Sequence, residues 1–412
     1  MKNRWLDWRR RIGLFFAVVG PGIITANVDN DAGGLATYSQ AGADFGLDLL
    51  WLFLPLTLVL ILVQEMANRM GVVTGDGLSS LIRERFGVKV TFYLMIALLL
   101  TNFGNVMAEF AGIASAAGLF NVPPWLAVPV CAALIWLMVL RWNYQAVEKV
   151  FLVACLFYVA YVITAFVVDP DAGEVARAFV EPKIIPARAY LVMAIGLIGT
   201  TIAPWMQFYQ QAAIVEKGVA VEDYAYSKAD TVVGGIVVSL VAACIVIVCA
   251  HTLHPAGVHI DDASQAALAL APLAGARASL LFAFGLWNAS MFAACILPLS
   301  TSYTVCEALG WERGVDQSYK DAPQFYFLYT AQIVLGALIV LIPRISLVRI
   351  MIVSQVVNGL LLPVILVFMI ILVNDKKLMG RHRNGPVYNV VCLAAIAVLI
   401  VLSLLYVLTM LK

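Results

Sequence analysis

The sequence predicts an all-α integral membrane protein of about eleven transmembrane helices. Its 412 residues are 63% hydrophobic and only 12% charged, and the apolar residues gather in runs long enough to cross a bilayer. Two of these runs are interrupted at their middles, one from Asp31 to Gly34 and one from Ala203 to Trp205. The interruptions occupy corresponding places in the two halves of the chain, which predicts two related helical repeats.

Windows of bilayer length place the eleven spans along the chain. In order, they cover approximately residues 14–43, 49–70, 90–118, 125–142, 147–168, 190–215, 231–253, 279–309, 325–342, 347–373 and 387–411. Spans one to five form a predicted first repeat over 14–168, and spans six to ten form a second repeat over 190–373. The eleventh, 387–411, is an addition to what is expected to be a single transmembrane domain over 1–412.

The two breaks predict both the architecture and a site. Five spans separate the first break from the second, and an odd number places the repeats in opposite orientations, as in the LeuT class of proteins. Non-helical backbone at membrane depth is tolerated only where protein or a water-filled cavity satisfies it, so paired breaks are typical of a secondary transporter's substrate site. The carboxylate of Asp31 at the first break favours a cation there.

Charge in the short loops predicts the orientation in the cell membrane. Lys and Arg cluster before the first span, after the second and after the tenth, and such clusters stay cytoplasmic. The N-terminus is therefore expected inside the cell and the C-terminus outside. The net charge of +1 gives no indication of a nucleic-acid partner. The seven cysteines are scattered through apolar runs without C-x-x-C spacing, which predicts neither a disulfide framework nor a zinc site.

Several segments resemble, in the right order, the NRAMP family of metal-ion transporters. Gly20-Pro21-Gly22 and the following stretch from Asp31 to Ala43 are similar to that family's first helix, whose motif is Asp-Pro-Gly-Asn. The further similar segments are residues 71–75, 109–112 with 119–120, 199–204 and 354–363. The resemblance extends over most of the chain. It implies the LeuT-type fold with broken helices 1 and 6, and divalent metal ions as the transported substrate in a lipid bilayer.

The resemblance also implies which residues contact the metal, and two of these are changed. Gly34 stands where the family motif ends in Asn, and Ala203 stands where the family has the Met of Met-Pro-His. The remaining expected donors are Asp31, backbone carbonyls near Thr200 and the Gln355 amide, all of them oxygen. Loss of the soft sulfur and a wider cavity favour partly hydrated Mg²⁺, with Mn²⁺ also transported. This pattern resembles the NRAMP-related magnesium transporters.

The positions of the family's proton route are changed as well. The family's third-span glutamate matches Glu109, and the family has another carboxylate three residues before it. The family also has two histidines in the sixth span. Here these positions are Val106, Trp205 and Gln210, none of which titrates near a working pH. The sequence therefore predicts uncoupled passage of Mg²⁺. Glu109 is left open between a role at the cavity and a protonated core residue, and Trp205 is interpreted as a wall or gate of the cavity.

The other candidate residues also have structural interpretations. Asp31 could cap the outer half-helix, and Gln355 could be an interhelical hydrogen-bonding residue. Asp29 could touch the ion or lie in the aqueous approach to it. Asn105 and Asn288 are interpreted as polar packing residues between helices.

Four other classes of function are weighed on the same residues. The nearest is a proton-coupled manganese or iron transporter of the same family. A sodium-coupled amino-acid carrier would place a substrate carboxylate beside Asp31, which disfavours it, and broken inverted repeats disfavour a channel. No H-E-x-x-H or G-x-S-x-G motif indicates an enzyme, so we expect no cofactor, only the transported ion. No feature of the sequence indicates an oligomeric state.

Overall fold

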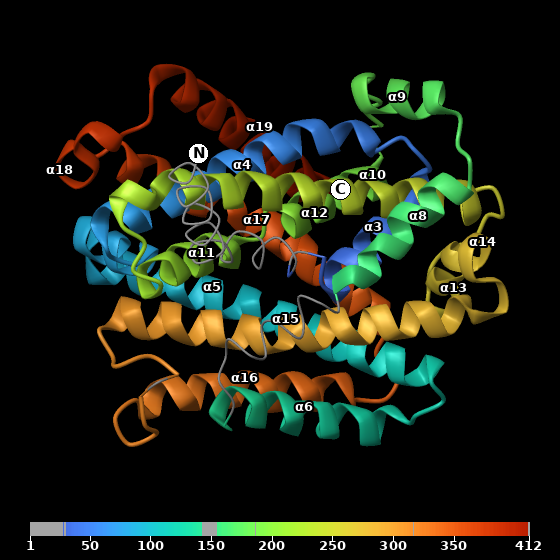
Figure 1. Ribbon diagram of the computed structural model, residues 1–412, viewed down its shortest axis with the longest axis horizontal. Coiled ribbons are helices and arrows are strands. Elements are labelled where there is room, and N and C mark those ends of the chain that lie inside the picture. The colour runs from blue at the N-terminus through green and yellow to red at the C-terminus, as the bar shows by residue number, and fades with distance from the viewer. Residues whose placement is uncertain (1–27, 29, 142–154, 186, 316, 411–412) are drawn as a thin grey trace, which may run out of the picture.

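Helices form all the regular structure in the part of the chain that the computed structural model describes, residues 28, 30–141, 155–185, 187–315 and 317–410 (Figure 1). The long helices are α4 Phe53–Thr74, α5 Leu78–Leu119, α6 Pro124–Arg141, α12 Tyr224–Thr252, α15 Ala278–Leu309, α16 Pro323–Val340, α17 Leu347–Val373 and α19 Pro386–Met410. The shorter ones are α3 Ala32–Phe45, α8 Val159–Val167, α9 Ala172–Val180, α10 Arg188–Thr201, α11 Pro204–Glu216, α13 Ala263–Ala267, α14 Ala271–Ala274 and α18 Lys376–Met379. Six 3₁₀ turns connect them: Leu50–Leu52, Cys155–Tyr158, Val221–Asp223, Leu268–Leu270, Gly275–Arg277 and Gly380–His382. The predicted all-α class is confirmed.

The predicted membrane spans agree with the described helices. Eight helical segments in this part of the chain are long and apolar enough to cross a membrane, one of them formed by α10 and α11 together, and α6 is a shorter apolar helix. The first and fifth predicted spans extend into residues outside the described part, and α3 and α8 are their described portions. Helix α5 begins at Leu78 rather than near residue 90 and bends at Gly87, whose φ of 82° favours glycine.

Helices α5, α15 and α17 pack together at the centre of the molecule (Figure 1). Helices α16 and α6 cover one side of the α5–α15 pair, while α3, α10 and α12 lie on the other side. Close approach depends on small residues, as is common between membrane helices. A Cβ atom on Gly199 of α10 would lie 1.9 Å from the Gln355 carbonyl oxygen of α17, so these two backbones touch at this point.

The loops gather at two opposite ends of the bundle. Helices α9, α13 and α14 lie at one end, whereas α18 and the beginning of α5 lie at the other (Figure 1). The loops after the fifth and seventh predicted spans, residues 169–185 and 254–278, therefore share one end, and the basic segment after the tenth span lies at the opposite end. Which end faces the cytoplasm stays a prediction. The boundaries of the two repeats also stay a prediction.

Candidate functional site

The first predicted break, from Asp31 to Gly34, falls at the beginning of α3: Asp31 precedes the helix, whereas the other three residues already form its first turn. Asp31 has extended backbone (φ −68°, ψ −172°) and is the N-cap of the helix, with its Oδ1 accepting a hydrogen bond of 2.7 Å from the Gly34 backbone N–H. Asp is a favoured N-cap residue, and the positive end of the helix dipole stabilises its negative charge. Gly34, predicted at the metal site, thus contributes a backbone donor to Asp31. Only 4% of Asp31 is exposed, so a charged group is buried here.

The Gln355 amide and the Asp31 carboxyl group both lie next to Gly33. A methyl group built on Gly33 would lie 1.9 Å from Gln355 Nε2 and 3.2 Å from Asp31 Oδ1. Gln355 comes from the middle of α17 and is 1% exposed. The structure therefore brings together the two predicted side-chain donors, from opposite halves of the chain. Gly33 is needed because any side chain there would displace the amide.

Glu109 of α5 lies on the other side of the same break. Its Oε2 accepts a hydrogen bond of 3.3 Å from the Ala32 backbone N–H, and its carboxyl group lies close to that of Asp31. Its second oxygen, Oε1, is buried without a hydrogen-bond partner. The two titratable side chains of the site, Asp31 and Glu109, are therefore neighbours at the first break.

The second break lies between α10 and α11, again where the sequence predicts it. Helix α10 ends at Thr201, and α11 begins at Pro204, a residue suited to the first helical position because it lacks an N–H. The carbonyl of Ala203 accepts hydrogen bonds of 3.1 Å from both the Met206 N–H and Gln207 Nε2. The Thr200 hydroxyl is buried without a partner. This break offers oxygens, but the Ala203 carbonyl is already engaged.

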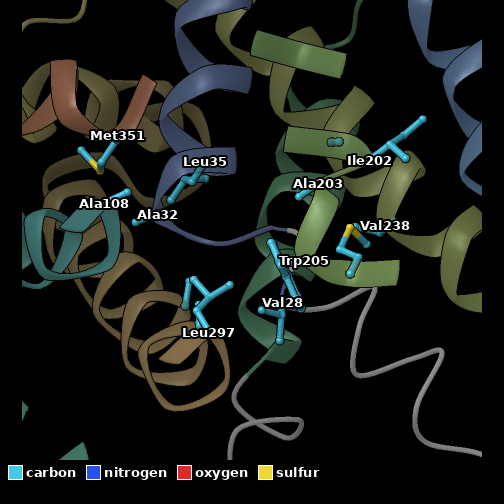
Figure 2. Close-up of a cluster of buried hydrophobic side chains, with 14 of the residues drawn as sticks. Val28, Ala32, Leu35, Ala108, Ile202, Ala203, Trp205, Val238, Leu297 and Met351 are labelled. Carbon is cyan, nitrogen blue, oxygen red and sulfur yellow. The ribbon is translucent and has the colours of Figure 1, made fainter. Parts of the chain in front are cut away.

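Trp205 fills the space beside the second break. Figure 2 shows its indole between Ala203 and Val28, with Ala32 at the start of α3 lying against Ala108 of α5. The indole is 1% exposed. This position agrees with the interpretation of Trp205 as a wall, and a gating role stays a prediction. Asp29, the remaining candidate, lies outside the described residues.

Two tyrosines that the sequence analysis missed hold the breaks in place. The Tyr158 hydroxyl, from the fifth span, donates to the Asn30 carbonyl just before α3. The Tyr38 hydroxyl pairs at 3.0 Å with Thr201 Oγ1 and so joins α3 to the end of α10. Tyr158 belongs to no motif, and its partner is distant in the sequence. Tyr38 lies within the first-helix segment already singled out and could have been proposed from it.

The site thus offers carboxylate, hydroxyl and carbonyl oxygens, while the Gln355 amide turns its nitrogen toward Gly33; Asp31 and Glu109 are the titratable members. In the described part of the chain, no group of three or more His, Cys, Asp or Glu side chains gathers as a metal cluster. An ion held here would therefore meet few charged ligands. Hard cations such as Mg²⁺ and Mn²⁺ suit oxygen donors of this kind.

Known proteins similar to this chain agree with this architecture. A Mn-transporter structure from Eremococcus coleocola superposes with a TM-score of 0.77 at 21% identity, covering 95% of this chain and 86% of that one. The nucleobase-cation-symport-1 transporter Mhp1 superposes with a TM-score of 0.62 at 14% identity, covering 94% and 89%. These likenesses confirm the predicted LeuT-type fold.

Sequence comparison gives the family. The "Divalent metal cation transporter MntH" of Granulibacter bethesdensis is 26% identical, covering 96% of this chain and 88% of that protein. The protein of the same name from Burkholderia ambifaria is 27% identical, covering 97% and 90%. The family model for natural resistance-associated macrophage protein-like (Nramp) proteins matches residues 22–409. This match spans nearly the whole sequence, and the chain therefore belongs to the Nramp family.

Proposed function

We propose that this chain carries divalent metal cations across the membrane by alternating access, with partly hydrated Mg²⁺ as the preferred ion and Mn²⁺ as a second substrate. Its family makes it a transporter rather than an enzyme. The observation that carries the proposal is the convergence of Asp31 and Gln355 at Gly33, beside the second helix break. Matched breaks of this kind mark the substrate sites of secondary transporters.

The preference for Mg²⁺ is supported by the chemistry of the donors. Mg²⁺ is bound by oxygen and gives up its water reluctantly, so it is usually held by one or two carboxylates with several waters retained. Asp31 supplies a carboxylate, Gln355 an amide, and the end of α10 near Thr200 supplies hydroxyl and carbonyl groups. Alanine at position 203 removes the sulfur that would favour softer ions at this break.

Uncoupled transport is supported by the neutral surroundings of Glu109. A proton on Glu109 can pass to Asp31, whose carboxyl group lies beside it. In the other direction along α5, Asn105 and Asn102 are one and two turns away and cannot titrate. Val106, Trp205 and Gln210 occupy the positions where a relay would be needed. With the N-terminus in the cytoplasm, a negative-inside potential then drives entry by about 2.3 kcal/mol per charge per 100 mV.

A proton-coupled manganese transporter is the second candidate, and one observation favours it. The carboxyl groups of Asp31 and Glu109 are neighbours, so a proton held by either would be released if an arriving cation required both as carboxylates. A cycle that released this proton on one side and regained it on the other would couple metal to proton movement. The two candidates differ in the preferred ion and in whether such a proton leaves the site.

The experiment that separates them is metal uptake into proteoliposomes with a pH-sensitive dye inside. We expect Mg²⁺ to enter under a negative-inside potential without a change in lumenal pH, and Mn²⁺ to compete with it. Acidification that follows metal entry in a fixed ratio would contradict uncoupled transport. Uptake of Mn²⁺ that is unaffected by an excess of Mg²⁺ would contradict the proposed ion preference.

A further inference from the structure

Three buried side-chain amides form a continuous hydrogen-bonded chain that ends at the proposed ion site. Asn105 of α5 and Asn358 of α17 pair reciprocally: Asn105 Nδ2 donates to Asn358 Oδ1 at 3.0 Å, and Asn358 Nδ2 donates to Asn105 Oδ1 at 2.9 Å. Asn358 Nδ2 also donates to Gln355 Oε1 at 2.8 Å. All three side chains are at most 1% exposed. We call this set, Asn105, Asn358 and Gln355, the amide chain.

The amide chain fixes which atom of Gln355 faces Asp31. Because Asn358 engages the Gln355 oxygen, the Gln355 nitrogen is the atom that lies against Gly33, next to Asp31. An NH₂ group there suits an empty site, since it is a donor placed next to the Asp31 carboxylate. It does not suit an occupied site, because an amide nitrogen carries no lone pair for a cation and its protons repel one.

The amide chain can reverse its orientation without losing a hydrogen bond between its three members. If all three amides turn over, Asn358 Oδ1 takes the former place of its Nδ2 and accepts from both Asn105 Nδ2 and Gln355 Nε2. The reciprocal pair between Asn105 and Asn358 is unchanged in form. The Gln355 oxygen then faces the site. The terminal torsion of Asn and Gln has two broad minima, so both orientations are compatible with the side-chain geometry. Ser354 Oγ donates its proton to the Met351 carbonyl at 2.7 Å and accepts from Gln355 Nε2 at 3.4 Å, so the reversed state gives up only this long contact outside the amide chain.

We propose that Asn105 and Asn358 are positioning residues that hold Gln355 in two alternative orientations, nitrogen toward the empty site and oxygen toward a bound dication. The inference rests on the proposed function, because it takes the ion to lie beside Asp31. It assigns Asn105 a role that the sequence analysis missed, since that residue was interpreted as packing. Beside a fixed donor, Gln355 would be hydrogen-bonded in only one of its two orientations, because in the other its NH₂ group would meet that donor. The reversible Asn105–Asn358 pair offers Gln355 a donor in one orientation and an acceptor in the other.

The test is a double-mutant cycle on Mg²⁺ affinity, measured by calorimetry on the purified full-length protein in detergent. Asn105→Leu with Asn358→Leu replaces both members of the pair by apolar side chains of similar size, so that neither asparagine is left without the other and only the Gln355 oxygen loses its donor. The same pair of substitutions is then made on a Gln355→Met background. We expect about fivefold weaker Mg²⁺ binding with Gln355 present, the worth of one net hydrogen bond, and no further loss on the Gln355→Met background.

A matched control is available on the same helix. Asn374 and Asn389 form a second reciprocal amide pair, at 2.8 and 2.9 Å, between α17 and α19. Asn374→Leu with Asn389→Leu should leave Mg²⁺ affinity unchanged. Equal losses with and without Gln355, or no loss at all, would overturn the positioning role. Asp31→Asn tests the proposed function separately. If the ion does not bind beside Asp31, this variant would bind Mg²⁺ as tightly as the wild type.

Discussion

The two helix breaks are alike in position but differ in chemistry. The first carries a buried carboxylate, which a backbone donor from Gly34 orients and a second carboxyl group from Glu109 contacts. The second carries no charge: Ala203 and Pro204 provide space, Trp205 lines it, and the Ala203 carbonyl is engaged by its own helix. In the proposed mechanism, the first break therefore attracts the cation, whereas the second determines the volume of the site and whether a soft ligand is present.

This difference implies that substitutions in the two breaks should change different properties. Changes at the first break should reduce binding of every divalent ion, because they remove charge or its orientation. Changes at the second break should alter the ratio between ions, because they change donor type and volume without changing charge.

The largest effect is expected for Asp31→Asn. Asn also caps helices well, so the fold should persist, but the site loses the charge that attracts the dication. We expect uptake of both Mg²⁺ and Mn²⁺ in proteoliposomes to fall by about 100-fold or more, because a dication close to a buried carboxylate gains several kcal/mol. Asp171→Asn is the matched control, since Asp171 caps the exposed helix α9 by the same kind of bond to Gly173. Comparable uptake in the Asp31 variant would place the ion elsewhere.

The next largest effect is expected for Gly33→Ala. The added methyl group would lie 1.9 Å from Gln355 Nε2, so the amide must move away from Asp31. We expect Mg²⁺ affinity, measured by calorimetry, to fall by about tenfold, with Mn²⁺ affected similarly. Gly118→Ala serves as control, because a methyl group on that α5 glycine meets nothing within 4 Å. If Gly33→Ala bound Mg²⁺ normally, Gln355 would have no part in the site.

A change of selectivity is expected for Ala203→Met. The thioether adds a soft donor at the second break, which favours Mn²⁺ over Mg²⁺. We expect the ratio of Mn²⁺ to Mg²⁺ uptake to rise by several fold, about fivefold, for a gain of ~1 kcal/mol. Ala203→Leu adds a similar volume without sulfur and should lower both rates while leaving the ratio unchanged. An equal rise in the leucine variant would show that volume, not sulfur, decides the preference.

The smallest effect is expected from freeing the Ala203 carbonyl. Gln207 donates to this oxygen and in turn accepts from Gln64, so replacing both glutamines by methionine leaves no buried partner unpaired. A carbonyl released from one neutral donor is a slightly better ligand. We expect Mg²⁺ affinity to increase by about twofold, on the order of half of a net hydrogen bond. Weaker binding by calorimetry would mean that Gln207 itself supports the site.

Local sequence signals predicted the breaks well. Asp31 is a favoured N-cap residue and Pro204 a favoured first helical residue, so the start of α3 at Ala32 and of α11 at Pro204 could be read from residue type alone. Gly33 and Gly34, predicted to lie in the break, belong to the first turn of α3 instead. Length and hydropathy predicted most spans, because they too are properties of one continuous segment. The early start of α5 was missed because Gly87, inside one continuous apolar and basic stretch, bends the helix without ending it.

Contacts between distant segments could not be predicted in the same way. Tyr158 reaches the Asn30 carbonyl, and Asn105 pairs with Asn358, across separations of 128 and 253 residues. A neutral amide in an apolar span carries no information about its partner, so Asn105 was interpreted as packing. The proximity of Glu109 to Asp31 was equally hidden, because it depends on how α5 crosses the start of α3.

The central claim, uncoupled passage of a dication through the site at Asp31, is tested most directly by the reversal potential of Mg²⁺ flux. Proteoliposomes clamped by potassium and valinomycin allow the voltage of zero net uptake to be found for a series of Mg²⁺ gradients. We expect about 30 mV per tenfold gradient, the value for a divalent carrier, with no change when a pH gradient is imposed. A reversal potential that shifts with the pH gradient would show that a proton moves with the metal and would contradict the account.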